Sequence, residues 1–200
     1  MKRHSTKSAE HYTPPYLVEA ARELMGTIDL DPASSSLAQT VVKSISFLTK
    51  ADNGLTSPWY GNILINAHGS CKVDGVLTDC YKPPRKDGTQ KKNCTCGLVS
   101  RFWRKLLSEF EADRTKQAIW IGFSCGQLEL LQTDHDDGPL SWPTCFPRKR
   151  VKYYSEAGTL LPTLVEGSSP PQNSYISYLG PRVHEFKTLF EPFGRCVVPL

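Results

Sequence analysis

The feature that most constrains the fold is a short aliphatic stretch, residues 61–65, with the sequence GNILI. Three consecutive large aliphatic residues are typical of a strand buried on both faces, as in a parallel sheet. The stretch stops abruptly at Asn66, which is followed by Ala67, His68 and Gly69. Ligands of open α/β sheets bind outside the carboxyl ends of the strands, so this turn is the first candidate for a site.

An uncharged amide at such a strand end has a definite chemical use. The side chain of Asn66 can accept a hydrogen bond from a substrate NH2 group and donate another one. The alternative is that Asn66 only caps a turn, which is the usual role of an isolated Asn-x-x-Gly sequence. The order of the other motifs in the chain favours the first interpretation.

Length and composition indicate one α/β domain. Two hundred residues, 39% of them hydrophobic and 22% charged, can bury a substantial core. No apolar run approaches the ~20 residues of a membrane span, and no apolar segment follows the basic start. We therefore expect a cytoplasmic protein without a membrane partner. Seven cysteines is an odd number, and a reducing compartment makes a disulfide framework unexpected.

Hydrophobic periodicity and the positions of capping and turn residues predict alternating strands and helices. Residues 1–10 form a polar basic arm, Thr13 is placed to cap the first helix, and Gly26 is placed to end it. Residues 70–97 form a long insertion rich in lysine and cysteine. Alternation of strands with helices favours a Rossmann-like sheet in a single domain, residues 11–200. The helices are expected over 17–25, 34–43, 100–110, 127–131 and 184–190, and the strands over 28–31, 45–48, 61–65, 118–123, 151–154, 175–179 and 196–198.

Several short motifs occur in a recognisable order. They are Tyr12-Thr13-Pro14-Pro15, Leu30-Asp31-Pro32-Ala33-Ser34, Asp52-Asn53-Gly54-Leu55, Pro58-Trp59, the Asn66 turn, Phe102-Trp103, residues 118–124, residues 147–150 and residues 169–175. This ordered set resembles the phage-type DNA N6-adenine methyltransferases (Dam-like). The resemblance implies a Rossmann-like fold that binds S-adenosylmethionine and methylates adenine in DNA. In a phage such an enzyme would act in the host bacterial cytoplasm and shield DNA in restriction-modification.

The resemblance also implies a set of cofactor-binding residues. Asp31 would accept a hydrogen bond from the ammonium of the cofactor. Asp52 would accept one from the adenine amino group or the ribose, and Leu55 would pack on the adenine ring. Each has an ordinary alternative, because Asp-Pro and Asp-Asn-Gly are common turn sequences. The full set is Tyr12, Thr13, Pro14, Asp31, Pro32, Ala33, Ser34, Asp52 and Leu55.

The implied reaction is direct methyl transfer. The side-chain oxygen of Asn66 and the carbonyl of Ala67 would hold the adenine amine in line with the sulfonium methyl, which is an orientation effect. The target base must leave the duplex stack. The family usually has Asn-Pro-Pro and an aromatic residue or glycine, whereas this chain has Ala67, His68 and Gly69. Phe123, at the end of the next strand, is our substitute for the stacking aromatic; its alternative role is in the core.

Two further groups of residues lead to weaker predictions. Cys-x8-Cys-x13-Cys-x-Cys in the insertion would suit zinc, with His68 as a substitute ligand, or these are free surface thiols. Basic clusters would bind DNA phosphates, or they are ordinary solvated surface. The second hypothesis for the whole chain is a catalytically degenerate, zinc-clipped DNA-binding module. The metal candidates are Cys71, Cys80, Cys94 and Cys96; the DNA candidates are Lys82, Arg85, Lys86, Lys91, Lys92, Arg148, Lys149 and Arg150; and the expected core thiols are Cys125, Cys145 and Cys196.

Overall fold

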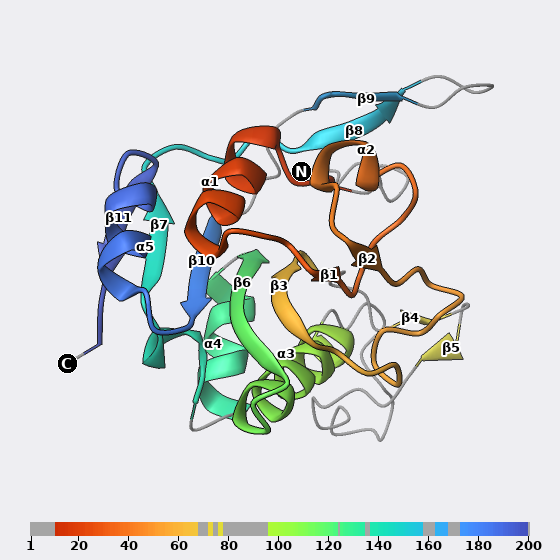
Figure 1. The fold of residues 1–200 in the computed structure, drawn as a ribbon, viewed down its shortest axis with the longest axis horizontal. Coiled ribbons are helices and arrows are strands. Elements are labelled where there is room, and N and C mark those ends of the chain that lie inside the picture. Colours follow the sequence, from red (N-terminus) through yellow and green to blue (C-terminus); the bar gives the residue numbers. More distant parts are fainter. Residues whose placement is uncertain are drawn as a thin grey trace, which may run out of the picture.

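A seven-stranded sheet with helices on both faces forms the centre of the computed structural model (Figure 1). The structure describes residues 11–67, 72–73, 76–77, 96–123, 125–134, 137–157, 163–167 and 173–199. Along the sheet the strands are β11 (Gly194–Val197), β7 (Thr144–Pro147), β10 (Ser174–Leu179), β6 (Thr115–Phe123), β3 (Gly61–Ile65), β1 (Leu30–Asp31) and β2 (Ser46–Phe47).

Most strands of this sheet point in one direction. The neighbours β2, β1, β3 and β6 are parallel. Strand β10 is antiparallel to both β6 and β7, and β11 is antiparallel to β7, so only β10 and β11 are reversed within the sheet. The α/β class predicted from the sequence is confirmed, and the parallel block is compatible with a Rossmann-like arrangement.

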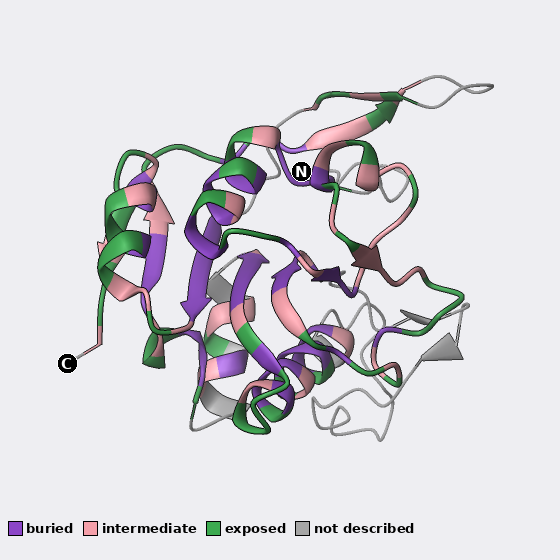
Figure 2. Cartoon of the chain, viewed as in Figure 1, coloured by how far each residue is buried: buried purple, intermediate pink, exposed green. Residues whose placement is uncertain are grey.

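The helices bury the two faces of the sheet in separate apolar cores. Helices α1 (Pro15–Met25) and α5 (Val183–Phe190) pack with Leu64 on one face. Helices α3 (Cys96–Glu111) and α4 (Cys125–Asp134) pack with Ile63 and Ile65 on the other. Figure 2 shows the buried residues concentrated on the strands and the inward helix faces. The aliphatic stretch is therefore buried on both faces, as the sequence predicts.

The ends of α1 agree with the prediction at one end only. Pro15 occupies the first turn, and Gly26 follows the helix with φ 82°, a conformation that glycine adopts without steric cost. At the start, Pro14 is the N-cap residue and no side chain caps the helix. The expected capping role of Thr13 is wrong, because its hydroxyl is used elsewhere.

Several elements differ from the sequence expectations. Of the helix expected over 34–43, only α2 (Gln39–Val42) forms, since the chain turns before it. The strand expected over 151–154 begins later, as β8 (Tyr154–Ala157), and pairs with the unforeseen β9 (Thr163–Glu166). Strand β7 is not among the predicted strands, because its four residues, with a proline at one end, show no clear alternation of apolar and polar side chains. The remaining elements are the hairpin β4 (Lys72–Val73) and β5 (Val76–Leu77) and the 3-10 turn η1 (Pro139–Ser141).

None of the helices in the described part of the chain combines the length and apolar character needed to cross a membrane.

Candidate functional site

The strand order reverses between β1 and β3. From β1 the chain adds β2 on one side and then returns to place β3 on the other side. Such a switch point, outside the carboxyl ends of the strands, is where open α/β sheets bind ligands. Asp31 is the last residue of β1, and Asn66 directly follows β3. Two residues selected from the sequence therefore flank the switch point of the observed sheet.

The amide of Asn66 has a fixed orientation. Its nitrogen donates to the backbone oxygen of His11 at 3.0 Å and to the hydroxyl oxygen of Thr13 at 3.1 Å. A backbone carbonyl can only accept, so the nitrogen must be the atom that faces it. Both N–H groups are thus used, while the Asn66 side-chain oxygen accepts no hydrogen bond from the described residues. The side-chain oxygen of Asn66 can therefore accept a further hydrogen bond, and Thr13 helps to hold the amide in this orientation.

Asp31 is a buried carboxylate that has no cationic partner among the residues that the structure describes. It is 6% exposed and accepts from the Ala33 N–H at 3.3 Å and from Gln39 Nε2 at 3.2 Å. Burial raises its pKa to about 6, against the lowering effect of the bonds from Ser34, Ala33 and Gln39. Within the described ranges no cationic side chain pairs with it. An arriving ammonium group would supply the missing charge.

Three aromatic rings, those of His11, Phe123 and Tyr153, form a cluster that is linked to the Asn66 amide through the backbone of His11. The ring of Phe123, which ends β6, lies 6.4 Å from that of His11 and 5.1 Å from that of Tyr153, centroid to centroid. The rings of His11 and Tyr153 are 5.9 Å apart. His11 therefore contacts Asn66 through its backbone and Phe123 through its ring, and it brings these two predicted residues into one site.

His11 and Tyr153 were not selected from the sequence. His11 immediately precedes the Tyr12-Thr13 motif, which is the one signal that could have found it. Tyr153 lies in the predicted strand 151–154, where nothing in the sequence indicated a site residue; its hydroxyl lies 2.8 Å from that of Ser174, and burial raises its pKa.

The loop that carries Asp52 lies beside β1, although its carboxylate is used locally. A Cβ at Gly54 would collide with the carbonyl oxygen of Pro32, which shows how closely this loop covers the turn after β1. Exposed Asp52 accepts from the Thr49 N–H at 2.8 Å and from its hydroxyl at 2.7 Å, and these bonds lower the pKa of Asp52. Leu55 packs against the apolar core on the α3 side of the sheet.

The other predicted cofactor residues mostly hold the backbone around these groups. Tyr12 is buried and exchanges two 2.9 Å backbone hydrogen bonds with Tyr154. The Ser34 hydroxyl accepts from Gln39 Nε2 at 2.8 Å, and its N–H donates to Leu48. Pro14, Pro32 and Ala33 lie in the turns that precede α1 and follow β1.

Most of the predicted metal and DNA ligands lie outside the described residues. These are Cys71, Cys80, Lys82, Arg85, Lys86, Lys91, Lys92 and Cys94. Two residues predicted for the catalytic turn, His68 and Gly69, also lie outside the described residues. Cys96 is the first residue of α3. Exposed Arg148, Lys149 and Arg150 follow β7. Because β7 runs in the same direction as β3, this basic cluster lies at the same end of the sheet as Asn66, three strand spacings (roughly 14 Å) across the sheet and three or more residues further along it by register.

Comparisons with models of protein families, with curated proteins and with solved structures returned no match. The geometry of the strand ends therefore carries the functional argument: a mixed α/β sheet presents an oriented amide, a buried carboxylate and an aromatic cluster at one edge.

Proposed function

We propose that the chain is a DNA adenine-N6 methyltransferase that uses S-adenosylmethionine. The observation that carries the proposal is the Asn66 amide: its N–H groups both donate to the chain, while its oxygen accepts from none of the described residues and could accept from a substrate. An adenine amine needs such an acceptor. The order of motifs along the sequence supports the same assignment.

Asp31 fits the amino-acid end of the cofactor. Its carboxylate is buried with no cation beside it among the described residues, so the ionised form is poorly solvated and a bound ammonium would stabilise it. Asp31 lies at the end of β1, next to the strand that carries the Asn66 amide. In this proposal Asp31 would hold the cofactor and Asn66 the base, side by side at neighbouring strand ends.

The residues of the chain supply orientation more than acid–base chemistry. S-adenosylmethionine, when bound, provides an electrophilic methyl group on a sulfonium. The oxygen of Asn66 would accept from the adenine amine and keep the nitrogen lone pair directed at that methyl group, and the Ala67 carbonyl would be the second acceptor. Exposed His11 and partly buried Phe123 would offer ring surface to the displaced base, while fully buried Tyr153 supports these two rings from the core side.

Contacts to DNA phosphates would come from the basic cluster after β7. Arg148, Lys149 and Arg150 are exposed at the same sheet edge as Asn66. Positive side chains at this distance can bind the backbone that flanks a displaced base, and binding should weaken with salt. The lysines of the insertion remain a second predicted group.

A transfer assay tests the function directly. Protein incubated with methyl-labelled S-adenosylmethionine and unmethylated DNA is expected to place label in N6-methyladenine. The cofactor should also raise the midpoint of thermal unfolding, because it binds only the native state. DNA binding with neither label transfer nor a thermal shift would instead support the degenerate DNA-binding module.

Thr13→Val should slow methyl transfer about fivefold at saturating cofactor. The change keeps the shape of the side chain but removes one of the two acceptors of the Asn66 amide, a loss of about 1 kcal/mol in its orientation. Thr40→Val is the matched control, because the exposed Thr40 hydroxyl donates to the Leu37 carbonyl away from the site. Equal initial rates for the two variants would remove Thr13 from the catalytic arrangement.

A further inference from the structure

Two cysteines face each other across the outer strands of the sheet. Cys145 of β7 and Cys196 of β11 are register partners in an antiparallel pair. Arg148 and Phe193 are a hydrogen-bonded pair, because the Arg148 N–H donates to the Phe193 oxygen at 2.9 Å. Along an antiparallel ladder, hydrogen-bonded and non-hydrogen-bonded pairs alternate, and Cys145 and Cys196 are three pairs further on. Cys145 and Cys196 therefore form a non-hydrogen-bonded pair, where Cα atoms approach to about 4.5 Å. This spacing lies within the range that a disulfide requires.

Both thiols point to the same side of the sheet. The Cys145 sulfur lies 3.4 Å from the Phe190 oxygen, and the Cys196 sulfur lies 4.0 Å from the Lys187 oxygen, both on α5. Cys145 is fully buried, whereas Cys196 is partly exposed. The chain thus offers one accessible thiol with a second thiol directly behind it. Both cysteines are free.

The accessible thiol lies in a cationic hollow of about 410 Å3. Three cationic side chains and one carboxylate line it, so the lining is positive overall. The lining residues are Arg148, Lys187, Glu191, Gly194, Arg195 and Cys196. The thiol of Cys145 lowers the pKa of the Cys196 thiol by hydrogen bonding; burial and Glu191 oppose this effect, and Lys187 adds to it. The same contact and burial raise the pKa of Cys145.

We propose that Cys145 and Cys196 form a thiol–disulfide exchange site for small anionic disulfides such as glutathione disulfide. Positive charge in the hollow attracts the anion and favours the thiolate that attacks it. Cys196 is the attacking residue because it is the accessible one. This proposal does not rest on the methyl-transfer proposal, since the two cysteines lie on β7 and β11 and the site uses neither Asn66 nor Asp31; Arg148 is shared with the basic cluster after β7.

The exchange proceeds in two steps. The Cys196 thiolate attacks one sulfur of glutathione disulfide; a protein–glutathione S–S bond forms, the original S–S bond breaks, and one glutathione thiolate leaves. Cys145 then gives up its proton to solvent and attacks the Cys196 sulfur, which releases the second glutathione thiolate. The protein dithiol is oxidised to a disulfide, and one glutathione disulfide is reduced to two glutathione molecules.

Mass spectrometry of protein treated with glutathione disulfide tests the site. Trypsin cleaves after Arg195, so Cys196 is released on the peptide 196–200, and a cross-link to the peptide that carries Cys145 is diagnostic. Wild type is expected to form this cross-link, and Cys145→Ser should instead accumulate glutathione on Cys196. Cys196→Ser should leave Cys145 unmodified. Glutathione on wild-type Cys196 without the cross-link, or modification of Cys145 in Cys196→Ser, would overturn the assignment.

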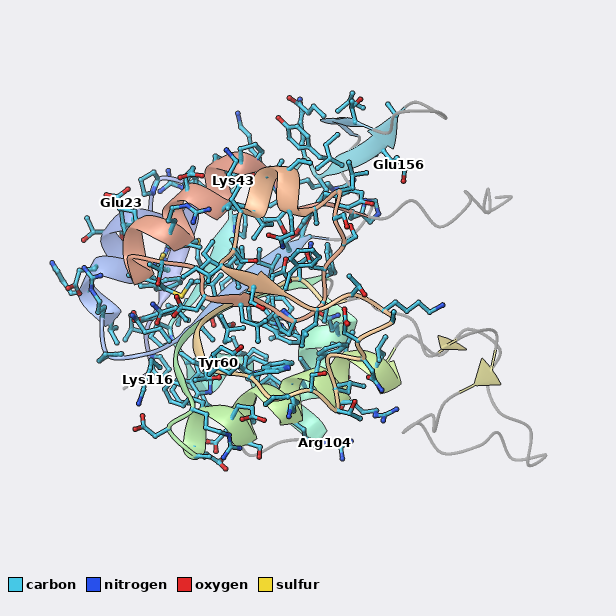
Figure 3. All side chains as sticks on the ribbon, turned by 45° about the vertical axis from the view of Figure 1, so that its right-hand side comes forward. Glu23, Lys43, Tyr60, Arg104, Lys116 and Glu156 are labelled. Atoms are coloured by element: carbon cyan, nitrogen blue, oxygen red, sulfur yellow. The ribbon has the colours of Figure 1, made fainter. Side chains whose placement is uncertain are left out.

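Charge variants test the role of the hollow. Lys187→Gln should slow the reaction of Cys196 with glutathione disulfide several-fold, and it should slow the reaction with an uncharged disulfide less. Lys116→Gln is the control, because Lys116 lies on the surface at the start of β6 and pairs with Asp113 (Figure 3). Equal slowing by the two variants would show that the hollow does not attract the anion.

Discussion

Asn66→Ala is expected to lower the rate of methyl transfer to DNA at least about a hundredfold, with the affinity for S-adenosylmethionine nearly unchanged. Loss of a single oriented polar group that acts on the reacting atoms typically has an effect of this size. In this protein the group is the side-chain oxygen, since the nitrogen is committed to the His11 carbonyl and the Thr13 hydroxyl. Single-turnover rates with labelled cofactor measure the loss directly.

The same strand provides a matched control for this substitution. Asn62 lies at the opposite end of β3, and its nitrogen donates to the Met25 oxygen at 3.0 Å and to the Thr27 hydroxyl at 3.2 Å. It therefore makes the same two kinds of bond as Asn66, but at the edge without the site. Asn62→Ala should cost a similar amount of stability and leave transfer intact. Equal activity of Asn66→Ala and Asn62→Ala would end the proposed role of Asn66.

A second variant separates the oxygen of Asn66 from its fixed orientation. Asn66→Asp keeps an oxygen that can accept from the adenine amine. It replaces the NH2 group that donates to His11 and Thr13 with a second oxygen, so the His11 carbonyl would repel the carboxylate. We expect this variant to lose most of the transfer rate as well, because an acceptor in the wrong orientation does not align the amine.

The central strand and its site-bearing end were predictable because burial on both faces leaves a clear signature. Ile63, Leu64 and Ile65 have no polar position between them, so residues 61–65 could only be an interior strand. The polar residues at the strand ends followed from that assignment. The partners of Asn66 did not, since His11 lies 55 residues earlier in the chain. A single sequence gives no signal for a backbone carbonyl that accepts across the fold.

Local sequence also misassigned residues whose role depends on distant contacts. Thr13 before two prolines has the pattern of a helix cap, yet Pro14 takes the cap position and the hydroxyl bonds to Asn66. Cys145 was correctly expected in the core, and Cys196 packs against the same core. Their opposition across two strands was not foreseen, because β7 is too short and too close to prolines to show a strand period.

Asp31→Asn is expected to weaken the binding of S-adenosylmethionine about a hundredfold, because it removes a buried charge that would pair with the cofactor ammonium. Asp29→Asn is the control: Asp29 precedes β1 and accepts from the Thr27 hydroxyl and the Asn62 N–H, each at 2.8 Å. Isothermal titration of both variants gives the two dissociation constants. Equal affinities would place the ammonium elsewhere.

The raised pKa of Asp31 gives affinity and stability opposite pH dependences. The folded value is about 6 and the ordinary value is 3.8, so protonation of Asp31 stabilises the fold at low pH and this contribution is lost as pH rises through 6. The free protein should gain about 1 kcal/mol from this group between pH 7 and pH 5. Over the same range cofactor affinity should fall, about tenfold per unit below pH 6, since the ammonium needs the ionised carboxylate. Asp31→Asn should flatten both curves, and an unchanged affinity profile in that variant would assign the pH dependence to another group.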